Sequence, residues 1–550
     1  MRRPLVLASI LATLSVGLDA RAQTAGINMG APVWNGVVST DAMKAAVATG
    51  APHVRVNFRL DKWTSPNDPG FFAAYEQIVD GITSQGLEVY GLLSDELAPE
   101  HDHLSAEFAD QYVAFATAVI DRYKNRVRVW ETINEPNDWA GGSSARFPAA
   151  TFADLHGRLY SSVKIAHQGD ACWDVKLVTG PLFSFDGNSS ASYLADVINA
   201  GRAGGGWKSV RDVLGKDPVD DVGYHVYVAQ GSDSSDADVG TSAGANLDAL
   251  KNVLSARGLG DKKIWISEIG YQAELLGDEG QAARVDATFA ALGARSDVAS
   301  IQWFTIGDFG GLGWGLFKET GFAASDRRPS WNAFAAQAKA YAPALAAKLV
   351  VDLPKTVEIG KPVVAKLTAT NLGKKTWTDG VRIGAASGCP SASSINGWTW
   401  SPASGDGYAK SLTDARRFLP GGKTVAQGES ITIDIPLANA AQTGKLHFAA
   451  RMVEEGVAWF GANASADVEI VPANASGASD DTGATGSNSS GAANGEGPST
   501  KGPSAAADSG CACREAPSRS DASGAARGVT FAAALIGLGL IARRRCVARR

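Results

Sequence analysis

Between Gly26 and about Leu345, short apolar runs alternate with longer, alanine-rich amphipathic stretches. The apolar runs predict eight β-strands, at Ile27–Gly30, Val54–Phe58, Glu88–Leu92, Val127–Ile133, Val175–Thr179, Asp221–Val228, Ile264–Glu268 and Ile301–Ile306. Helices are predicted between them, for example at Phe71–Ser84, Phe108–Tyr123, Phe152–His167 and Gln281–Leu292. Eight strand–helix units in about 320 residues favour an α/β fold of the (β/α)₈ type, the TIM barrel, over residues 23–345.

The pattern changes beyond Leu345. Period-two segments at Val363–Ala369, Ile431–Ile435 and Leu446–Met452 are separated by clusters of Gly, Pro and Asn. Alternation of this kind indicates half-buried strands, so residues 346–472 predict a small all-β sandwich.

Both ends of the chain have the composition of targeting segments. Residues 1–22 combine Arg2 and Arg3 with an apolar run and the small-x-small pattern Ala20-Arg21-Ala22, which predicts a secretory signal peptide. The apolar run is shorter than the ~20 residues of a membrane-spanning helix. We therefore expect the mature chain to begin near Gln23 and to be exported.

The C-terminal end divides into two segments. Residues 473–528 are rich in Gly, Ser and Ala, contain no large apolar residue and predict a flexible spacer. Residues 529–550 join an apolar run to an arginine cluster, which would hold the end of the chain on the cytoplasmic side. The body is then anchored at, or sorted to, the cell surface; an ordinary stop-transfer anchor is the alternative.

Composition narrows the function. With 45% hydrophobic and 20% charged residues the chain folds. Its net charge is −6, and without residues 1–22 and 511–550 the body has 40 basic and 54 acidic residues, a net charge of −14 that disfavours nucleic acid as a partner. The five cysteines, Cys172, Cys389, Cys511, Cys513 and Cys546, form no disulfide framework. The cluster Glu96, Glu100, His101, Asp102 and His103 superficially resembles a metal site, but a cleft lining or a solvated loop is favoured.

Two carboxylates fall at the ends of predicted strands. In Asn134-Glu135-Pro136, proline cannot continue a central strand, so Glu135 must lie where the fourth strand stops. Glu268 ends the seventh strand. Parallel barrel strands all end at the same face, so both side chains are expected at its mouth.

These motifs resemble the retaining glycoside hydrolases of clan A, the cellulase-like barrels. The resemblance implies that Glu135 is the acid/base and Glu268 the nucleophile of a double displacement on a carbohydrate substrate. It also implies substrate-binding residues. These are Arg55 on strand two, Asn134 at the end of strand four, His225 and Tyr227 on strand six, and Trp303 on strand eight. It implies no cofactor and no metal.

Physical chemistry adds expectations for this site. Ionised Glu268 should raise the pKa of Glu135 above its usual value, which keeps the acid protonated. His53, Arg55 and Asn57 should face the lumen, because alternate residues of a strand share one face. Asn134 and Glu135 are adjacent, so both reach a sugar only if the backbone kinks or bulges there.

Two further resemblances concern the C-terminal half. The run Ala369–Trp377, with Trp398, Trp400 and Trp459, resembles the Ig-like central domain of the Next-to-BRCA1 protein. A packing or spacer role is favoured for these tryptophans over glycan binding. The motif Gly510–Arg514 with the tail resembles the MYXO-CTERM sorting signal, which implies a sorting protease and the membrane as partners.

The combined interpretation is a secreted, surface-tethered and monomeric β-glycosidase. Endo-action on glucan, mannan or xylan is favoured, because a surface enzyme meets polymers first. An exo-acting β-xylosidase or β-glucosidase is the alternative within enzymes, and a non-hydrolytic glycan-binding protein the alternative outside them. Trp34, Trp63, Trp139 and Trp314 fall in predicted loops near strand ends, where tryptophans can stack on sugars.

Overall fold

The computed structural model describes residues 24–99, 101–138, 146–170, 173–308, 311–318, 321–386, 398, 400, 416–419 and 422–473. The predicted signal peptide, the spacer beyond residue 473 and the tail at 529–550 lie outside these residues, as do Glu100, Trp139, Cys172 and Cys389. In the described part, none of the helices has the length and apolar character needed to cross a membrane.

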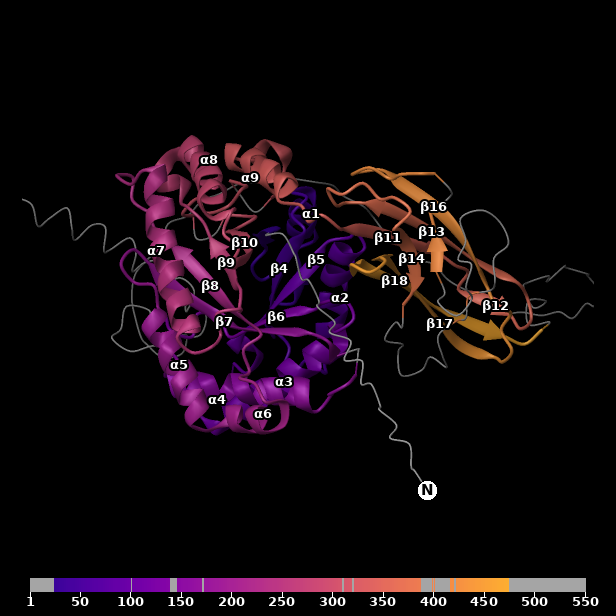
Figure 1. Cartoon of the computed structure of the whole chain (residues 1–550), viewed down its shortest axis with the longest axis horizontal. Coiled ribbons are helices and arrows are strands. Elements are labelled where there is room, and N and C mark those ends of the chain that lie inside the picture. The colour runs from indigo at the N-terminus through magenta and orange to yellow at the C-terminus, as the bar shows by residue number, and fades with distance from the viewer. Residues whose placement is uncertain are drawn as a thin grey trace, which may run out of the picture.

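Eight parallel strands close into a barrel in the spatial order β1-β10-β9-β8-β7-β6-β5-β4 (Figure 1). They are β1 (Thr24–Asn28), β4 (His53–Phe58), β5 (Glu88–Leu93), β6 (Val129–Thr132), β7 (Lys176–Phe185), β8 (Asp221–Tyr227), β9 (Ile264–Ile269) and β10 (Val298–Phe304). Each predicted strand overlaps one of these eight, so the (β/α)₈ prediction is confirmed. A short hairpin of β2 (Val33–Trp34) and β3 (Val37–Val38) follows β1.

Helices form the outer layer of the barrel (Figure 1). They are α1 (Thr40–Ala48), α2 (Pro69–Thr83), α3 (Ala106–Tyr123), α4 (Ala149–Tyr160), α5 (Ala191–Ala203), α6 (Gly206–Leu214), α7 (Asp236–Ser255), α8 (Ala273–Leu292) and α9 (Pro329–Ala340). Two of these helices begin at a polar N-cap residue. The side chain of Asp68 accepts a hydrogen bond from the backbone amide of Gly70 in α2, and that of Ser105 accepts one from the amide of Phe108 in α3. The single helix predicted over Phe152–His167 is instead α4 followed by a π-helical turn at Ser161–Ile165.

Strand alternation separates the core from the lumen. Val54, Val56 and Phe58 of β4 are fully buried in the main apolar core, while Arg55 between them points to polar partners inside the barrel. His53 meets Trp265 edge-on in the lumen. The predicted division of β4 into a polar lumen face and an apolar outer face is therefore correct.

The C-terminal domain is an all-β sandwich, as predicted. One sheet has the order β11 (Ala347–Asp352), β13 (Val363–Asn371), β16 (Ser430–Leu437); the other has β12 (Thr356–Glu358), β18 (Ala458–Val471), β17 (Gly444–Glu454), β14 (Val381–Ala385), β15 (Arg416–Phe418). Trp377, Trp398 and Trp400 are buried in the core between the sheets, which supports the packing role expected for them. The Ig-like resemblance stays a prediction.

The sandwich lies beside the barrel and contacts the end opposite the strand C-termini (Figure 1). Lys348 of β11 donates a hydrogen bond to Gln85, in the turn that leads from α2 into the start of β5. In the same turn, Gly86 approaches Lys348 and Leu372 so closely that a Cβ would clash with both. The sandwich therefore contacts the barrel at the end where the strands begin. The opposite end, the mouth, is formed by the loops that follow the strands.

Candidate active site

The chain bends sharply where β6 ends. The strand stops at Thr132, and Ile133 and Glu135 have φ angles of 51° and 46°. Positive φ is uncommon for residues other than glycine and persists only where the surroundings enforce it. The kink predicted from the adjacency of Asn134 and Glu135 is thus present.

Asn137 fixes this turn to the neighbouring strand. Its side chain donates to the carbonyl of Phe183 at 2.9 Å and accepts from the amide of Phe183 at 2.8 Å. It also donates to the hydroxyl of Ser190 at 2.8 Å. Asn137 follows the Asn134-Glu135-Pro136 motif directly, and its hydrogen bonds connect the turn after β6 to β7.

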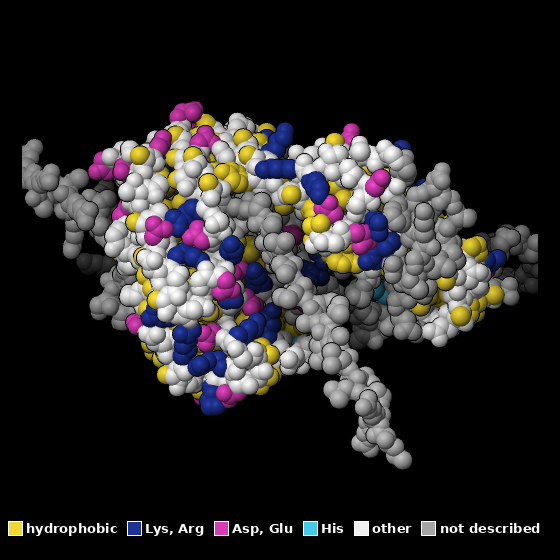
Figure 2. Space-filling model, viewed as in Figure 1, with side chains coloured by type: hydrophobic (Ala, Val, Ile, Leu, Met, Phe, Trp, Pro, Cys, Tyr) yellow, Lys and Arg dark blue, Asp and Glu magenta, His cyan; other side chains and the backbone are white. Residues whose placement is uncertain are grey.

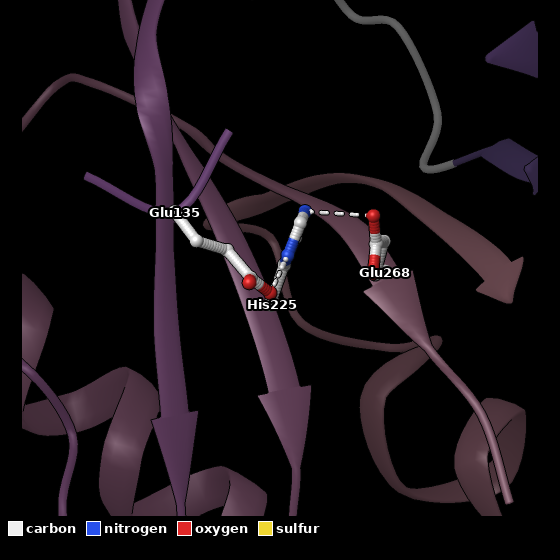
Figure 3. A group of neighbouring side chains, drawn as sticks. All are labelled: Glu135, His225 and Glu268. Carbon is white, nitrogen blue, oxygen red and sulfur yellow. Dashed lines mark hydrogen bonds and ion pairs between the residues drawn. The ribbon is translucent and has the colours of Figure 1, made fainter. Parts of the chain in front are cut away.

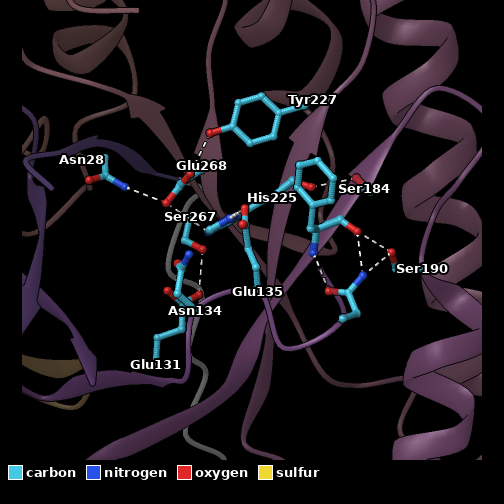
Figure 4. A network of polar contacts seen from close by, with 12 residues as sticks. Asn28, Glu131, Asn134, Glu135, Ser184, Ser190, His225, Tyr227, Ser267 and Glu268 are labelled. Atoms are coloured by element: carbon cyan, nitrogen blue, oxygen red, sulfur yellow. Dashed lines mark hydrogen bonds and ion pairs between the residues drawn. The ribbon is translucent and has the colours of Figure 1, made fainter. Parts of the chain in front are cut away.

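Glu268 of β9 is buried and receives three side-chain donors. Arg55 donates to Oε1 at 2.7 Å, and Asn28 of β1 donates to the same oxygen at 3.3 Å. The hydroxyl of Tyr227 donates to Oε2 at 2.6 Å (Figure 4). Charge-assisted hydrogen bonds of this kind favour the ionised carboxylate. Asn28 was not among the predicted site residues.

Arg55 is the hub of the polar network in the lumen. Besides Glu268, it donates from Nε to Glu131 at 2.9 Å and from Nη2 to the side-chain oxygen of Asn134 at 3.1 Å. Burial by itself would lower the pKa of Arg55, but the carboxylates of Glu131 and Glu268 outweigh it and raise the pKa above its usual value. The guanidinium is therefore a permanent cation at the base of the site.

Glu131 is a fully buried carboxylate that the sequence analysis did not select. It also accepts hydrogen bonds from the hydroxyls of Tyr90 at 3.1 Å and Ser267 at 2.7 Å. One feature of the sequence could have identified Glu131: it is an acidic residue inside a predicted buried strand, and a buried charge requires polar partners.

Glu135 and Glu268 face each other with His225 between them (Figure 3). His225 Nδ1 lies 2.7 Å from Glu135 Oε1, and its Nε2 lies 3.5 Å from Glu268 Oε1. A carboxylate oxygen of each glutamate and a ring nitrogen of His225 all lie within 4.8 Å of one another.

Burial shifts the pKa values of two of these groups in opposite directions. It raises the pKa of Glu135 to about 8, helped by the nearby charge of Asp138. It lowers the pKa of His225 to about 4. The raised pKa of Glu135 agrees with expectation, but the expected cause was wrong: Glu268 is not among its main contributors. The physical reason is that Glu268 is paired with Arg55, whose positive charge offsets it.

An aromatic cluster lies beside Tyr227. Phe183 and Phe304 lie 5.9 and 6.4 Å from it between ring centres, and Trp314, from the loop after β10, lies 5.5 Å away. Trp303, predicted to lie under the sugar, is instead fully buried in the core outside the strands, where its ring centre lies 6.0 Å from that of Tyr271. Alternation along β10 sends Trp303 outward and Phe304 inward, so Phe304 replaces it in the cluster.

Ion pairs hold the described part of the loop after β5. Arg59 contacts Glu96 at 3.0 Å, and His103 contacts Asp95 at 3.2 Å. Among the described residues, only Glu135, His225 and Glu268 come together as a group with metal-ligand atoms. Arg55 binds Glu268 at 2.7 Å and occupies the side of that carboxylate with a positive charge, which opposes a metal ion there.

No protein-family model matches this chain, and no curated protein matches it either. Among solved structures, the chain is similar to GH5_18 from Streptomyces cattleya, with 16% identity over 62% of this chain and 85% of that one and a TM-score of 0.44. It is also similar to a glucosidase from Croceicoccus marinus (13% identity, 82% of this chain, 94% of that one, TM-score 0.43). A third is a family 39 glycoside hydrolase from Bacteroides cellulosilyticus WH2 (15% identity, 76% and 81%, TM-score 0.38). At identities this low the likeness extends to the fold alone.

The Arg55–Glu131 pair makes a stability prediction. Glu131→Gln removes one buried partner of a buried cation, so we expect the free energy of unfolding to fall by about 3 kcal/mol. Asp41→Asn, which removes an exposed partner of Lys44, is the control and should cost at most about 1 kcal/mol. Urea unfolding followed by tryptophan fluorescence measures both. Equal small losses for the two variants would show that the buried pair has no special role.

Proposed function

We propose that this protein is a glycoside hydrolase that cleaves β-linked polysaccharide or oligosaccharide with retention, using Glu135 as acid/base and Glu268 as nucleophile. The observation that carries the proposal is the approach of their carboxylate oxygens, within 4.8 Å, at the mouth of the barrel. Retaining glycosidases hold their two carboxyl groups ~5–5.5 Å apart, whereas inverting enzymes need ~6.5–9.5 Å to admit a water. The short separation supports direct attack on the anomeric carbon.

The environments of the two glutamates support different roles. With a pKa of about 8, Glu135 is protonated at neutral pH and can deliver its proton to the departing glycosidic oxygen. Three donors, Arg55, Asn28 and Tyr227, hold Glu268 as an anion ready to bond to the anomeric carbon. In the second half-reaction Glu135, now ionised, takes a proton from water while the oxygen of that water displaces Glu268.

His225 connects the two glutamates without adding charge. Its pKa of about 4 leaves it neutral at neutral pH, so one ring nitrogen carries a proton and the other accepts one. We assign the tautomer from the network: Arg55 Nη2, which can only donate, lies 3.5 Å from Nε2, so Nε2 is the acceptor and Nδ1–H donates to Glu135 Oε1 at 2.7 Å. His225 thus orients the acid while leaving the anion on Glu268.

Substrate contacts follow from the same network. Arg55 donates to the side-chain oxygen of Asn134, so the amide NH₂ of Asn134 is left to donate to a sugar hydroxyl. Phe183 and Phe304 keep a small exposed fraction next to Tyr227, suited to the C–H face of a sugar ring, whereas Trp314 is fully buried. A dead, purely sugar-binding barrel is disfavoured because both carboxylates and their partners are intact.

The cellular setting completes the proposal. The leader and tail expected from the sequence would export the enzyme and tether it to the cell surface, where polymers are its first substrates. Endo-action on glucan, mannan or xylan is therefore favoured over exo-action on small glycosides. The sandwich, which contacts the barrel opposite its mouth, serves as a spacer between the catalytic domain and the tether.

The test of this proposal is a hydrolysis screen of the full-length protein against glucan, mannan, xylan and their nitrophenyl glycosides. Glu268→Gln should lower kcat by about four orders of magnitude, because the attacking oxygen is lost. Glu135→Gln should lose far less activity on nitrophenyl glycosides than on polymers, because nitrophenolate leaves without a proton. Asp121→Asn, at the exposed C-terminal end of α3 opposite the mouth, is the control. Equal turnover by Glu268→Gln and the unmodified protein would refute the assignment.

The pH profile gives a second test. Only protonated Glu135 can act as the acid, so kcat/KM should fall as the pH rises through about 8. Asp138 raises the pKa of Glu135 through its negative charge, so Asp138→Asn should move this alkaline limb to lower pH. Initial rates across pH 4–10, about the range that protein titration covers, measure both curves. An alkaline limb that stays in place in Asp138→Asn contradicts Glu135 as its origin.

A further inference from the structure

Trp34 is the most exposed tryptophan in the part of the chain that the structure describes, at 54% of its full accessible surface. It lies on the β2–β3 hairpin, between β1 and α1. Large apolar side chains with this exposure are unusual on a barrel whose other described tryptophans are nearly all packed away. Trp34 is not part of the hydrophobic core, so its exposure on the hairpin is not explained by the stability of the fold.

The hairpin is attached to the same rim as Glu268. The backbone of Met29 donates to Arg55 at 3.0 Å and that of Asn57 donates to Gly30 at 3.1 Å, which ties the start of the hairpin segment to β4. Arg55 contacts Glu268, and Arg59, which packs on Trp34, is only four residues further along. The Cα atoms of Arg55 and Arg59 are at most about 14 Å apart, because four residues separate them, and Glu268 and Trp34 lie at the ends of their side chains. A glycan of several sugar units bound at Glu268 can therefore extend to Trp34.

One face of the indole is covered and held in place. The guanidinium of Arg59 lies 5.2 Å from the ring centre, and Arg59 is itself fixed by Asp61 at 3.1 Å and Glu96 at 3.0 Å. At the hairpin turn, a Cβ on Gly36 would clash with the side chain of Lys62. The turn therefore packs closely against the loop that follows β4. A supported aromatic ring with its other face open loses little entropy when a ligand stacks on it.

The charges around Trp34 define what it can take. Arg59 is committed to two carboxylates, Asp61 and Glu96, and is not available to pair with an acidic ligand. Lys62, which packs on Gly36, is a second cation, so the two cations and two carboxylates balance, and an acidic sugar would lose the hydration of its charge here without gaining a net attraction. A neutral sugar meets no such penalty, because its hydroxyls stay in water while its C–H face covers the indole.

We propose that Trp34 is a stacking platform for a sugar unit beyond the one cleaved, and that it selects long, neutral glycan chains over short or acidic ones. The inference rests on the proposed function and deepens it, because a platform outside the cleavage position favours endo-action on a polymer. It assigns Trp34 a specificity role and gives Arg59 a supporting one.

The test compares one long and one short substrate. In Trp34→Ala, the ratio of kcat/KM for a neutral hexasaccharide to kcat/KM for a nitrophenyl glycoside should fall about tenfold, with the loss in KM. Trp34→Phe retains a ring and should recover most of that ratio. Trp459→Ala removes an exposed tryptophan of the sandwich, which lies beside Arg416, and should leave the ratio unchanged. An unchanged ratio in Trp34→Ala overturns the proposal.

Direct binding separates this inference from the proposed function. Titration calorimetry of the full-length Glu268→Gln protein with gluco-, manno- and xylo-hexasaccharides and with an oligogalacturonate needs no turnover. We expect one or more neutral chains to bind, with about tenfold weaker binding in the Trp34→Ala, Glu268→Gln double variant, and the acidic chain not to bind. Failure of all neutral chains to bind, or tighter binding of the acidic one, overturns the platform. If the unmodified protein binds these chains but does not hydrolyse them, the catalytic proposal is refuted and the stacking role of Trp34 is not.

Discussion

The buried guanidinium of Arg55 is the interaction on which the rest of the site depends. It contacts Glu131 from β6, Glu268 from β9 and the side chain of Asn134, so one cation connects three separate segments of the barrel. A buried charge is tolerated only with partners in good geometry, and removing one partner leaves an uncompensated charge. The same contacts therefore stabilise the lumen, fix the anion at Glu268 and orient the Asn134 amide.

Burial also divides the labour between the two facing glutamates. Glu268 has a cation and two further donors, whereas Glu135 has a neutral histidine and the nearby negative charge of Asp138. The same low-dielectric surroundings that raise the pKa of Glu135 lower that of His225. An acid and an anion can thus coexist at short range because Arg55 contacts Glu268 directly, whereas the charges of Arg146 and Arg55 offset only part of the cost of burying Glu135.

The turn after β6 shows how backbone and side chains cooperate. Positive φ angles at Ile133 and Glu135 let two adjacent residues serve one site, and Asn137 holds the distorted segment against β7. Backbone strain of order 1–3 kcal/mol per such residue persists only where surrounding contacts over-determine it. Pro136 lies beyond the end of β6 at Thr132, so its missing amide hydrogen costs the strand ladder no hydrogen bond.

Local pattern in the sequence was enough to find the eight strands, the sandwich, the kink before Pro136 and the two carboxylates at the mouth. Periodicity and turn residues act over a few positions, and each of these features depends on such short-range rules. The sequence analysis selected Trp303 where the structure has Phe304. The pairing of β10 with β9 contains register shifts, so which residues at the end of β10 face the lumen is determined only when the neighbouring strand is in place. Contacts such as Asn28 with Glu268 join residues 240 positions apart, and the buried Glu131 needs donors from three other strands. Only closure of the barrel brings such groups together, and that same closure removes the water which would otherwise screen them and leave the pKa values of Glu135 and His225 near normal.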